Sequence, residues 1–410
     1  MDKSQYRYRE GITVEDAADC IKDHVSLLTE TEEVLLLDSL GRTLAVDVTA
    51  VFDQPPFDRA PVDGYACRAC DTAGASHDGP VTLQVVEEID AGGFSNRTVE
   101  PGQAVRIMTG AAIPDGCDCC IRQEDTNYGE TQVEIYREMA PHANYCDQGE
   151  DFKAGTRMMK QGEKIGFVEI GNLAAMGLDR VTVYRKPRIA LITTGDEVTE
   201  PGQALRPGQI YNSNHYLISS RLAELGVETV WTKCLKDDAL QVADAVRQAV
   251  ELGADAVITT GGVSVGKKDI LHDSLDLLGA EKLFWRVNLK PGTPTVFAVF
   301  QGVPVICLTG NPFGAIANVE LLIRPMLAVL TGDPSLKAEE ATGVMADPFH
   351  KASPGRRFIR AIYRDGQVRL PDGLHSSGVL STMKGCNCLV DIEPGTGALN
   401  AGDSVRVWLL

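Results

Sequence analysis

The middle third of the chain alternates short apolar runs with segments in which apolar residues recur every three or four positions. The second spacing is that of one helix face, and the short runs have the length of buried strands. Strands that alternate with helices predict a doubly wound, mostly parallel sheet, followed by a long apolar helix from about 311 to 330. The expected strands are at 188–194, 227–235, 254–260, 283–289, 295–300 and 303–309.

The flanking regions follow a different pattern. One helix is expected at 13–28, followed by short alternating runs with frequent Gly and Pro, which predict an antiparallel β domain. The end of the chain alternates like the strands of a small β barrel. We therefore expect an α/β multidomain protein with an N-terminal region containing an inserted β domain (1–186), a central α/β domain (187–331) and a C-terminal β domain (332–410).

Composition and charge narrow the function classes. The 410 residues include 44% hydrophobic residues, and the net charge is −18. Such a charge repels nucleic acid and anionic membranes, so neither is expected as a partner. No signal peptide is visible in the first residues, and no stretch is expected to reach the roughly 20 apolar residues of a membrane helix. These features predict a soluble, cytoplasmic protein.

The 11 cysteines are an odd number without a secretory context, which indicates reduced thiols. Cys67 and Cys70 form one group, and Cys117, Cys119 and Cys120 form another. Together they leave open a zinc site, although the spacing is loose and no His accompanies them.

Four strand ends in the central region carry polar or glycine-rich turns: 193–197, 236–238, 261–269 and 308–312. In a parallel sheet these turns converge on one rim, where ligands bind. Glycine lets backbone N–H groups approach an anion, and a helix N-terminus adds partial positive charge. The candidate ligand contacts are Gly261, Gly262, Ser264, Gly266, Asn311 and Pro312, with Lys290 from another strand end.

The turn GGVSVGKKD matches the opening of a nucleotide P-loop, but Lys268 stands where a Ser or Thr hydroxyl would bind Mg²⁺. Three acids on neighbouring turns, Glu197, Asp237 and Asp269, could instead bind Mg²⁺ through hard carboxylate oxygens. The alternative is that Asp237 and Asp269 are helix caps or acids of a first helical turn.

Longer motifs cover nearly the whole chain. They are FDRAPVDGYA (57–66), RIMTGAAIPDGCD (106–118), GEDFKAG (149–155), TTGDEV (193–198), GQIYNSN (208–214), KPGTP (290–294), TGNP (309–312) and SSGVLSTMKGCN (376–387). With these motifs the chain resembles the molybdopterin molybdenumtransferase family, whose fold is related to the C-terminal domain of gephyrin.

The resemblance implies insertion of molybdate into adenylylated molybdopterin, with release of AMP, by a Mg²⁺-dependent homodimer with shared sites. It also implies the adenylyltransferase of the same pathway as a partner. By motif position, the N-terminal part would supply Asp63, Thr109 and Asp151 as catalytic residues. The central domain would supply Glu197, Asp237, Ser264, Asp269 and Lys290.

Three departures from the family pattern concern positions that favour anions or fix a turn, and one of them is the sequence LTGNPFGA (308–315) where the family usually has LPGNPVSA. The stretch 145–148 is Tyr-Cys-Asp-Gln where the family commonly has arginines, and Thr293 replaces a second lysine. They are expected to affect ligand affinity or the choice between molybdate and tungstate more than the fold. A catalytically weak scaffold or sensor for pterin or oxyanion, and a nucleotide hydrolase using the altered P-loop, are the alternative functions.

Overall fold

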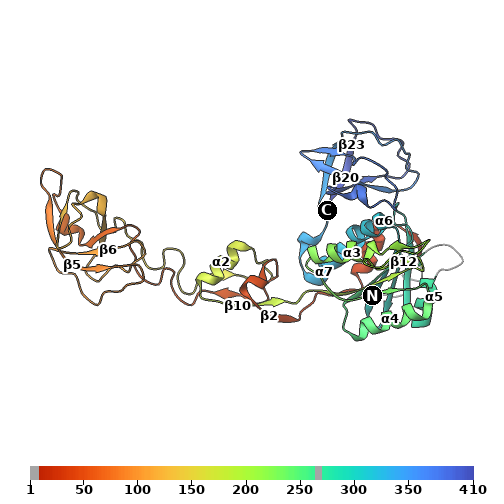
Figure 1. Cartoon of the computed structure of the whole chain (residues 1–410), viewed down its shortest axis with the longest axis horizontal. Helices are drawn as coiled ribbons and strands as arrows, with labels where there is room; N and C mark the ends of the chain where they lie inside the picture. Colours follow the sequence, from red (N-terminus) through yellow and green to blue (C-terminus); the bar gives the residue numbers. More distant parts are fainter. Residues whose placement is uncertain (1–8, 264–269) are drawn as a thin grey trace. The chain divides into compact units, whose positions relative to one another are not determined.

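The computed structural model describes residues 9–263 and 270–410, so the predicted site residues Ser264, Gly266 and Asp269 lie outside the described residues. The chain divides into two compact units, Met1–Glu32 with Tyr184–Leu410, and Glu33–Val183. Each unit is described by itself (Figure 1).

The first unit is built on a seven-stranded sheet. Only β17 runs antiparallel to its neighbours, so the prediction of a mostly parallel sheet is confirmed. The small strands β12 (Val198–Thr199) and β13 (Ile210–Tyr211) pair beside it. The strand order is β1 (Arg9–Ile12), β16 (Glu281–Val287), β17 (Val296–Phe300), β18 (Val303–Leu308), β15 (Ala256–Thr260), β11 (Arg188–Thr194) and β14 (Glu228–Leu235).

Helices cover both faces of this sheet. One face packs against α1 (Val14–Lys22), α3 (Ser213–Glu224) and the helix formed by α6 (Pro312–Asn318), η5 (Val319–Ile323) and α7 (Arg324–Thr331). The other face packs against α4 (Ala239–Glu251) and α5 (Ile270–Leu278). Strands covered on both faces are apolar at successive positions, which explains the continuous apolar runs.

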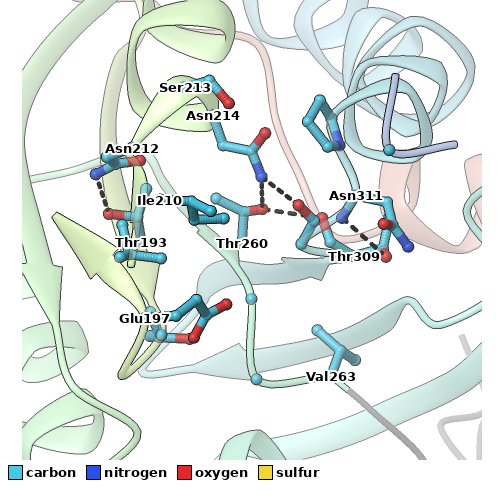
Figure 2. Close-up of a pocket in the computed structure, with 18 of the residues that line it drawn as sticks. Thr193, Glu197, Ile210, Asn212, Ser213, Asn214, Thr260, Val263, Thr309 and Asn311 are labelled. Atoms are coloured by element: carbon cyan, nitrogen blue, oxygen red, sulfur yellow. Dashed lines mark hydrogen bonds between the residues drawn. The ribbon is translucent and has the colours of Figure 1, made fainter. Parts of the chain in front are cut away.

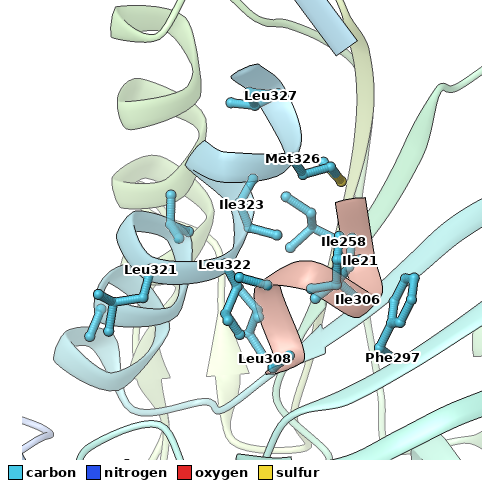
Figure 3. Close-up of a cluster of buried hydrophobic side chains, with 14 of the residues drawn as sticks. Ile21, Ile258, Phe297, Ile306, Leu308, Leu321, Leu322, Ile323, Met326 and Leu327 are labelled. Carbon is cyan, nitrogen blue, oxygen red and sulfur yellow. The ribbon is translucent and has the colours of Figure 1, made fainter. Parts of the chain in front are cut away.

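Two helix predictions need correction. The first helix ends at Lys22 rather than near 28, although Val25 and Leu28 beyond it still pack on the same core. The helix at 312–331 is long and apolar enough to cross a membrane, so the expectation that no stretch approaches this length is wrong. It is mostly buried and packs with α1 on the sheet residues Ile258 and Ile306 (Figure 3).

The predicted C-terminal β barrel is confirmed. Gly332, in the left-handed conformation at φ +69°, ends α7, and a closed barrel follows. Its strands, in spatial order, are β19 (Glu340–Met345), β21 (Gln367–Arg369), β20 (Arg357–Arg364), β22 (Cys388–Ile392) and β23 (Ser404–Leu409).

The second unit is rich in β structure. Its five-stranded sheet has the order β7 (Cys119–Arg122), β4 (Gly64–Cys67), β6 (Gln103–Ile107), β5 (Val81–Ile89) and β8 (Gln132–Ile135). Only β5 and β6 pair in parallel. The remaining elements are β2 (Thr31–Leu35) paired with β10 (Arg180–Tyr184), β3 (Val48–Thr49) paired with β9 (Arg157–Met159), and α2 (Phe167–Ala175).

The cysteines of this sheet belong to its hydrophobic packing. The Cys67 and Cys119 sulfur atoms lie 3.7 Å apart in one core, whereas Cys117 and Cys120 lie in another. All 11 cysteines are free thiols. No group of three or more His, Cys, Asp and Glu side chains in the described part of the chain could hold a metal ion. The zinc interpretation of the cysteines is therefore wrong.

Candidate functional site

A pocket of about 580 Å³ lies at the carboxyl ends of β11, β15 and β18, as the parallel sheet predicts (Figure 2). The turns at 193–197, 236–238, 261–263 and 309–312 all contribute to it, which confirms that the predicted turns converge. The pocket is lined by four of the predicted contacts and two of the predicted acids: Gly261, Gly262, Asn311 and Pro312, and Glu197 and Asp237.

Two glycines make the turn after β15 possible. Gly261 has φ +98° and Gly262 has φ +65°, conformations that residues with a Cβ rarely adopt. A Cβ on Gly261 would lie 2.2 Å from the Thr194 carbonyl oxygen, and one on Gly262 would lie 2.8 Å from the Ile270 side chain. The turn therefore packs directly against the end of β11, and only glycine fits at these two positions.

A chain of hydrogen bonds joins three elements at the pocket wall. The Asn214 Nδ2 atom, near the start of α3, donates to the Gly310 carbonyl at 2.8 Å and to the Thr260 hydroxyl at 3.0 Å. Thr260 in turn donates to the Thr309 carbonyl at 2.9 Å. Because a carbonyl only accepts, the Gly310 contact fixes the orientation of the Asn214 amide. The network ties α3, β15 and the turn before α6 together (Figure 2).

A second network fixes the neighbouring side of the pocket. Asn212 caps α3 by accepting from the His215 N–H at 3.2 Å. Its Nδ2 atom donates to the Thr193 hydroxyl at 2.8 Å and to Glu200 at 2.7 Å. The N-terminus of α3, with its partial positive charge, therefore opens on the pocket next to the end of β11.

The acids on the rim have different roles. Asp238 is the N-cap of α4, because its Oδ1 atom accepts from the Leu240 and Gln241 N–H groups at 3.0 Å each. Asp237, one residue earlier, lines the pocket together with Glu197. Two carboxylates that face one pocket fit the needs of Mg²⁺, which keeps several waters and takes few protein ligands.

Lys290 does not line this pocket. Its side chain is exposed, and its backbone is tied to the C-terminal barrel by hydrogen bonds with Arg356 (3.0 Å) and Phe358 (2.8 Å). Pro294, from the same motif, does reach the pocket. Lys290 as a substrate contact therefore stays a prediction.

The barrel contributes a wall that the sequence prediction missed. Gly378 lines the pocket, and the Ser377 carbonyl accepts from the Phe313 N–H at the start of α6 (3.0 Å). Arg360 is 1% exposed, donates to the Leu374 and Ser376 carbonyls, and stacks on the Phe313 ring at 4.5 Å. It thus supports the segment that carries Gly378.

In the second unit, two predicted site residues are in direct contact. The Asp63 Oδ1 atom accepts from both the backbone N–H and the hydroxyl of Thr109, at 2.7 Å each. These hydrogen bonds, the backbone one first, lower the pKa of Asp63 below its ordinary value, since they favour the charged form.

A hollow of about 470 Å³ adjoins Thr109 in the same unit. The third predicted residue of this unit, Asp151, does not line it; its side chain is exposed and its N–H donates to the Gln54 carbonyl at 2.9 Å. The hollow is lined by Arg59, Ala60, Pro61, Thr109, Gly110, His142, Asn144, Tyr145, Cys146 and Glu150.

Family models match the chain in three consecutive segments. They are the MoeA N-terminal region (domain I and II) at 12–177, a probable molybdopterin binding domain at 190–329, and the MoeA C-terminal region (domain IV) at 342–410.

Relatives and solved structures agree with these matches. A molybdopterin molybdenumtransferase of Staphylococcus epidermidis is 35% identical over 98% of this chain and 96% of its own length. One from Bacillus subtilis is also 35% identical, over 94% of this chain and 91% of its own length. A molybdopterin biosynthesis MoeA protein from Pyrococcus horikoshii, 30% identical, superposes with a TM-score of 0.81 over 97% of this chain and 99% of that one.

Proposed function

We propose that this chain inserts molybdate into adenylylated molybdopterin and releases AMP, because it belongs to the molybdopterin molybdenumtransferase family. The observation that carries the proposal is the pocket at the rim of the central sheet. Its glycine turns and the N-terminus of α3 suit phosphate oxygens, and its carboxylates suit a metal ion.

In this proposal, backbone groups of the rim bind the phosphate oxygens and acidic side chains bind the metal ion. The backbone N–H groups near Gly261 and Gly262, with the N-terminus of α3, bind and orient the diphosphate of the substrate. Glu197, Asp237 and Asp269 would hold Mg²⁺, which would neutralise charge between the two anionic reactants. Hydrolysis of the phosphoanhydride, in which a water oxygen bonds to one phosphorus atom and the bridging oxygen leaves with the other phosphate, then releases AMP and would make metal insertion favourable.

The test measures AMP release and cofactor formation from adenylylated molybdopterin and molybdate, with wild-type protein, Glu197→Gln and Asp237→Asn. We expect turnover that requires Mg²⁺, and a loss of about 100-fold in each variant because one ligand charge is removed. Binding without turnover in the wild type would instead favour the scaffold or sensor function. Parallel reactions with tungstate identify the preferred oxyanion.

We further propose a homodimer in which Asp63 and Thr109 of one subunit act with the rim acids of the other. Large apolar side chains are exposed in the second unit, at Leu37 (81%), Leu40 (61%) and Phe167 (83%). Leu37 and Phe167 belong to η2 (Leu36–Ser39) and α2, which are in contact, and adjoining exposed apolar side chains of this kind are candidates for a contact with a partner.

Complementation tests this assembly. After subunit exchange, a mixture of inactive Asp63→Ala and inactive Glu197→Ala chains should regain activity, since each mixed dimer contains one intact site. A mixture that stays inactive would mean that both residues act within one chain. We also propose a cytoplasmic location, with the adenylyltransferase of the pathway as the partner that delivers the adenylylated substrate.

A further inference from the structure

Arg59, in the second unit, lies on a strand-like segment that is fixed from both sides. Its N–H donates to the Cys146 carbonyl at 2.9 Å, and its carbonyl accepts from the Cys146 N–H at 3.1 Å. On the other side, Ala60 donates to Ala111 at 3.0 Å and accepts from Gly110 at 2.8 Å. The backbone of Arg59 therefore has one well-defined position at the wall of the 470 Å³ hollow.

The guanidinium of Arg59 is oriented by a sulfur atom rather than by a carboxylate. Its Nε donates to the buried Cys146 Sγ at 3.3 Å. No other side-chain hydrogen bond or ion pair of Arg59 is present among residues 9–263 and 270–410. Burial raises the pKa of the Cys146 thiol, so the neutral sulfur does not offset the charge of the guanidinium, whereas the carboxylates of Glu150 and Asp151 act on it through space without a direct ion pair. Four of the five guanidinium N–H donors remain for another acceptor.

The neighbouring acid is already engaged elsewhere. Asp58, next to Arg59 in sequence, accepts from the Tyr145 hydroxyl at 2.6 Å and from the Gln148 N–H at 2.7 Å. Tyr145 and Cys146 belong to the stretch 145–148, where the resemblance led us to expect arginines. Neither residue supplies a cation. Tyr145 donates a hydrogen bond to Asp58, and Cys146 accepts one from Arg59.

The surroundings of this arginine are acidic, and Glu150 and Asp151 act on its charge through space. Residues 33–183 contain 25 Asp and Glu but only 12 Lys and Arg, so an anion needs a local cation to bind in this unit. Besides Arg59, the hollow is lined by Thr109 and Gly110, by His142, which pairs with Asp147 at 2.9 Å, and by one acid, Glu150.

We propose that the hollow around Arg59 binds a tetrahedral dianion, with the Arg59 guanidinium as its cationic contact and Cys146 as the residue that positions this guanidinium. A planar guanidinium with free N–H groups is suited to two-point contact with the oxygens of such an ion. That the dianion is the metal oxyanion, rather than a phosphate of the nucleotide, rests on the proposed function.

The test is calorimetric titration of the full-length protein with tungstate, and separately with AMP. Arg59→Gln should weaken tungstate binding about tenfold or more, because it removes the one cation. Arg137→Gln is the matched control: it makes the same charge change at an exposed arginine of the same unit that does not line the hollow. It should change the affinity less than about twofold, since exposed charges are screened.

Two further variants act in opposite directions and keep the test independent of the folding of Arg59→Gln. Cys146→Val removes the sulfur acceptor and should weaken tungstate binding. Glu150→Gln removes the acid of the hollow and should strengthen it. Arg59→Lys keeps the charge but loses the two-point geometry, so its affinity should lie between those of the wild type and Arg59→Gln.

The outcomes separate this inference from the proposed function. Equal tungstate affinity in the wild type and Arg59→Gln, or no binding by the wild type at millimolar tungstate, overturns the site even if the protein is an active transferase. Arg59-dependent tungstate binding in a protein that forms no cofactor keeps the site and refutes the transferase. If AMP affinity falls in Arg59→Gln while tungstate affinity does not, the assignment of the metal oxyanion to this hollow is overturned and Arg59 is a contact of the nucleotide phosphate instead.

Discussion

The pocket at the rim of the central sheet and the hollow around Arg59 are built from different groups. The rim pocket is formed mainly by glycine turns, neutral side chains and the N-terminus of α3, with Glu197 and Asp237 as its charges. The hollow has ionisable side chains on its wall, with Arg59 as the cation. The rim pocket therefore depends mainly on the backbone geometry of its turns, whereas the hollow depends mainly on the charge of its side chains. Different substitutions should disable the two sites.

This difference follows from the architecture around each site. The rim is formed by strands that are buried on both faces, and its turns follow the strand ends directly, so backbone groups point into the pocket. The hollow lies beside irregular segments around Arg59, Thr109 and Cys146, where side chains provide most of the polar groups. A backbone site tolerates no added Cβ, whereas a side-chain site tolerates shape changes but not a lost charge.

The largest expected effect is that of Gly261→Ala on the rim. The added Cβ would lie 2.2 Å from the Thr194 carbonyl oxygen, at φ +98°, so the turn and the end of β11 must both move. We expect a loss of about 3 kcal/mol or more in the free energy of unfolding of the central domain, measured by denaturant titration.

Gly279→Ala is the control for this substitution. Gly279 has φ +72°, and a Cβ added there would have no atom within 4 Å, so the cost should be about 1 kcal/mol from backbone strain alone. Equal losses in the two variants would mean that the close approach of the turn to β11 adds nothing to stability.

The rim was largely predictable from sequence because glycine and strand signals act locally. The apolar runs predicted β11, β15 and β18. The turns that follow these strands converge, as a parallel sheet requires. Helix ends were less predictable. The apolar pattern continued past Lys22 because Val25 and Leu28 pack on the same core without being helical.

Contacts between distant segments were not predictable from one sequence. Asn214, Thr260 and Gly310 are ordinary polar or small residues that form a network only after three elements meet. The motif GQIYNSN marked the region of Asn214 but not its partners. The motif FDRAPVDGYA likewise marked the region of Arg59 but not its role, because that role depends on Cys146, 87 positions later.

An effect of intermediate size is expected from a double-mutant cycle on Asn214 and Thr260, which tests the hydrogen-bond network of the rim. Asn214→Ala leaves the Gly310 carbonyl without this donor, and Thr260→Val removes the hydroxyl that bonds to Asn214 and Thr309. Each should lower the free energy of unfolding by about 2 kcal/mol. Because the residues share a hydrogen bond, the double variant should lose less than the sum of the two. Additive losses would show that they act independently.

The smallest expected effect is on the ionisation of Asp63 in the second unit. Thr109→Val removes the hydroxyl hydrogen bond but keeps the backbone one, which is the larger cause of the lowered pKa of Asp63. The pKa of Asp63 should therefore rise only part of the way toward its ordinary value, as measured by NMR titration of the carboxyl carbon.

Since this pKa is lowered by folding, the stabilising contribution of Asp63 is lost as the pH falls through the folded-state pKa. In Thr109→Val this contribution should be smaller, and its loss should be complete at a higher pH, because the folded-state pKa lies closer to the unfolded one. Thr131→Val, at an exposed threonine of the same unit, should leave the titration unchanged. An Asp63 titration identical in Thr109→Val and the wild type would show that the hydroxyl contributes nothing, and that the backbone alone sets this charge.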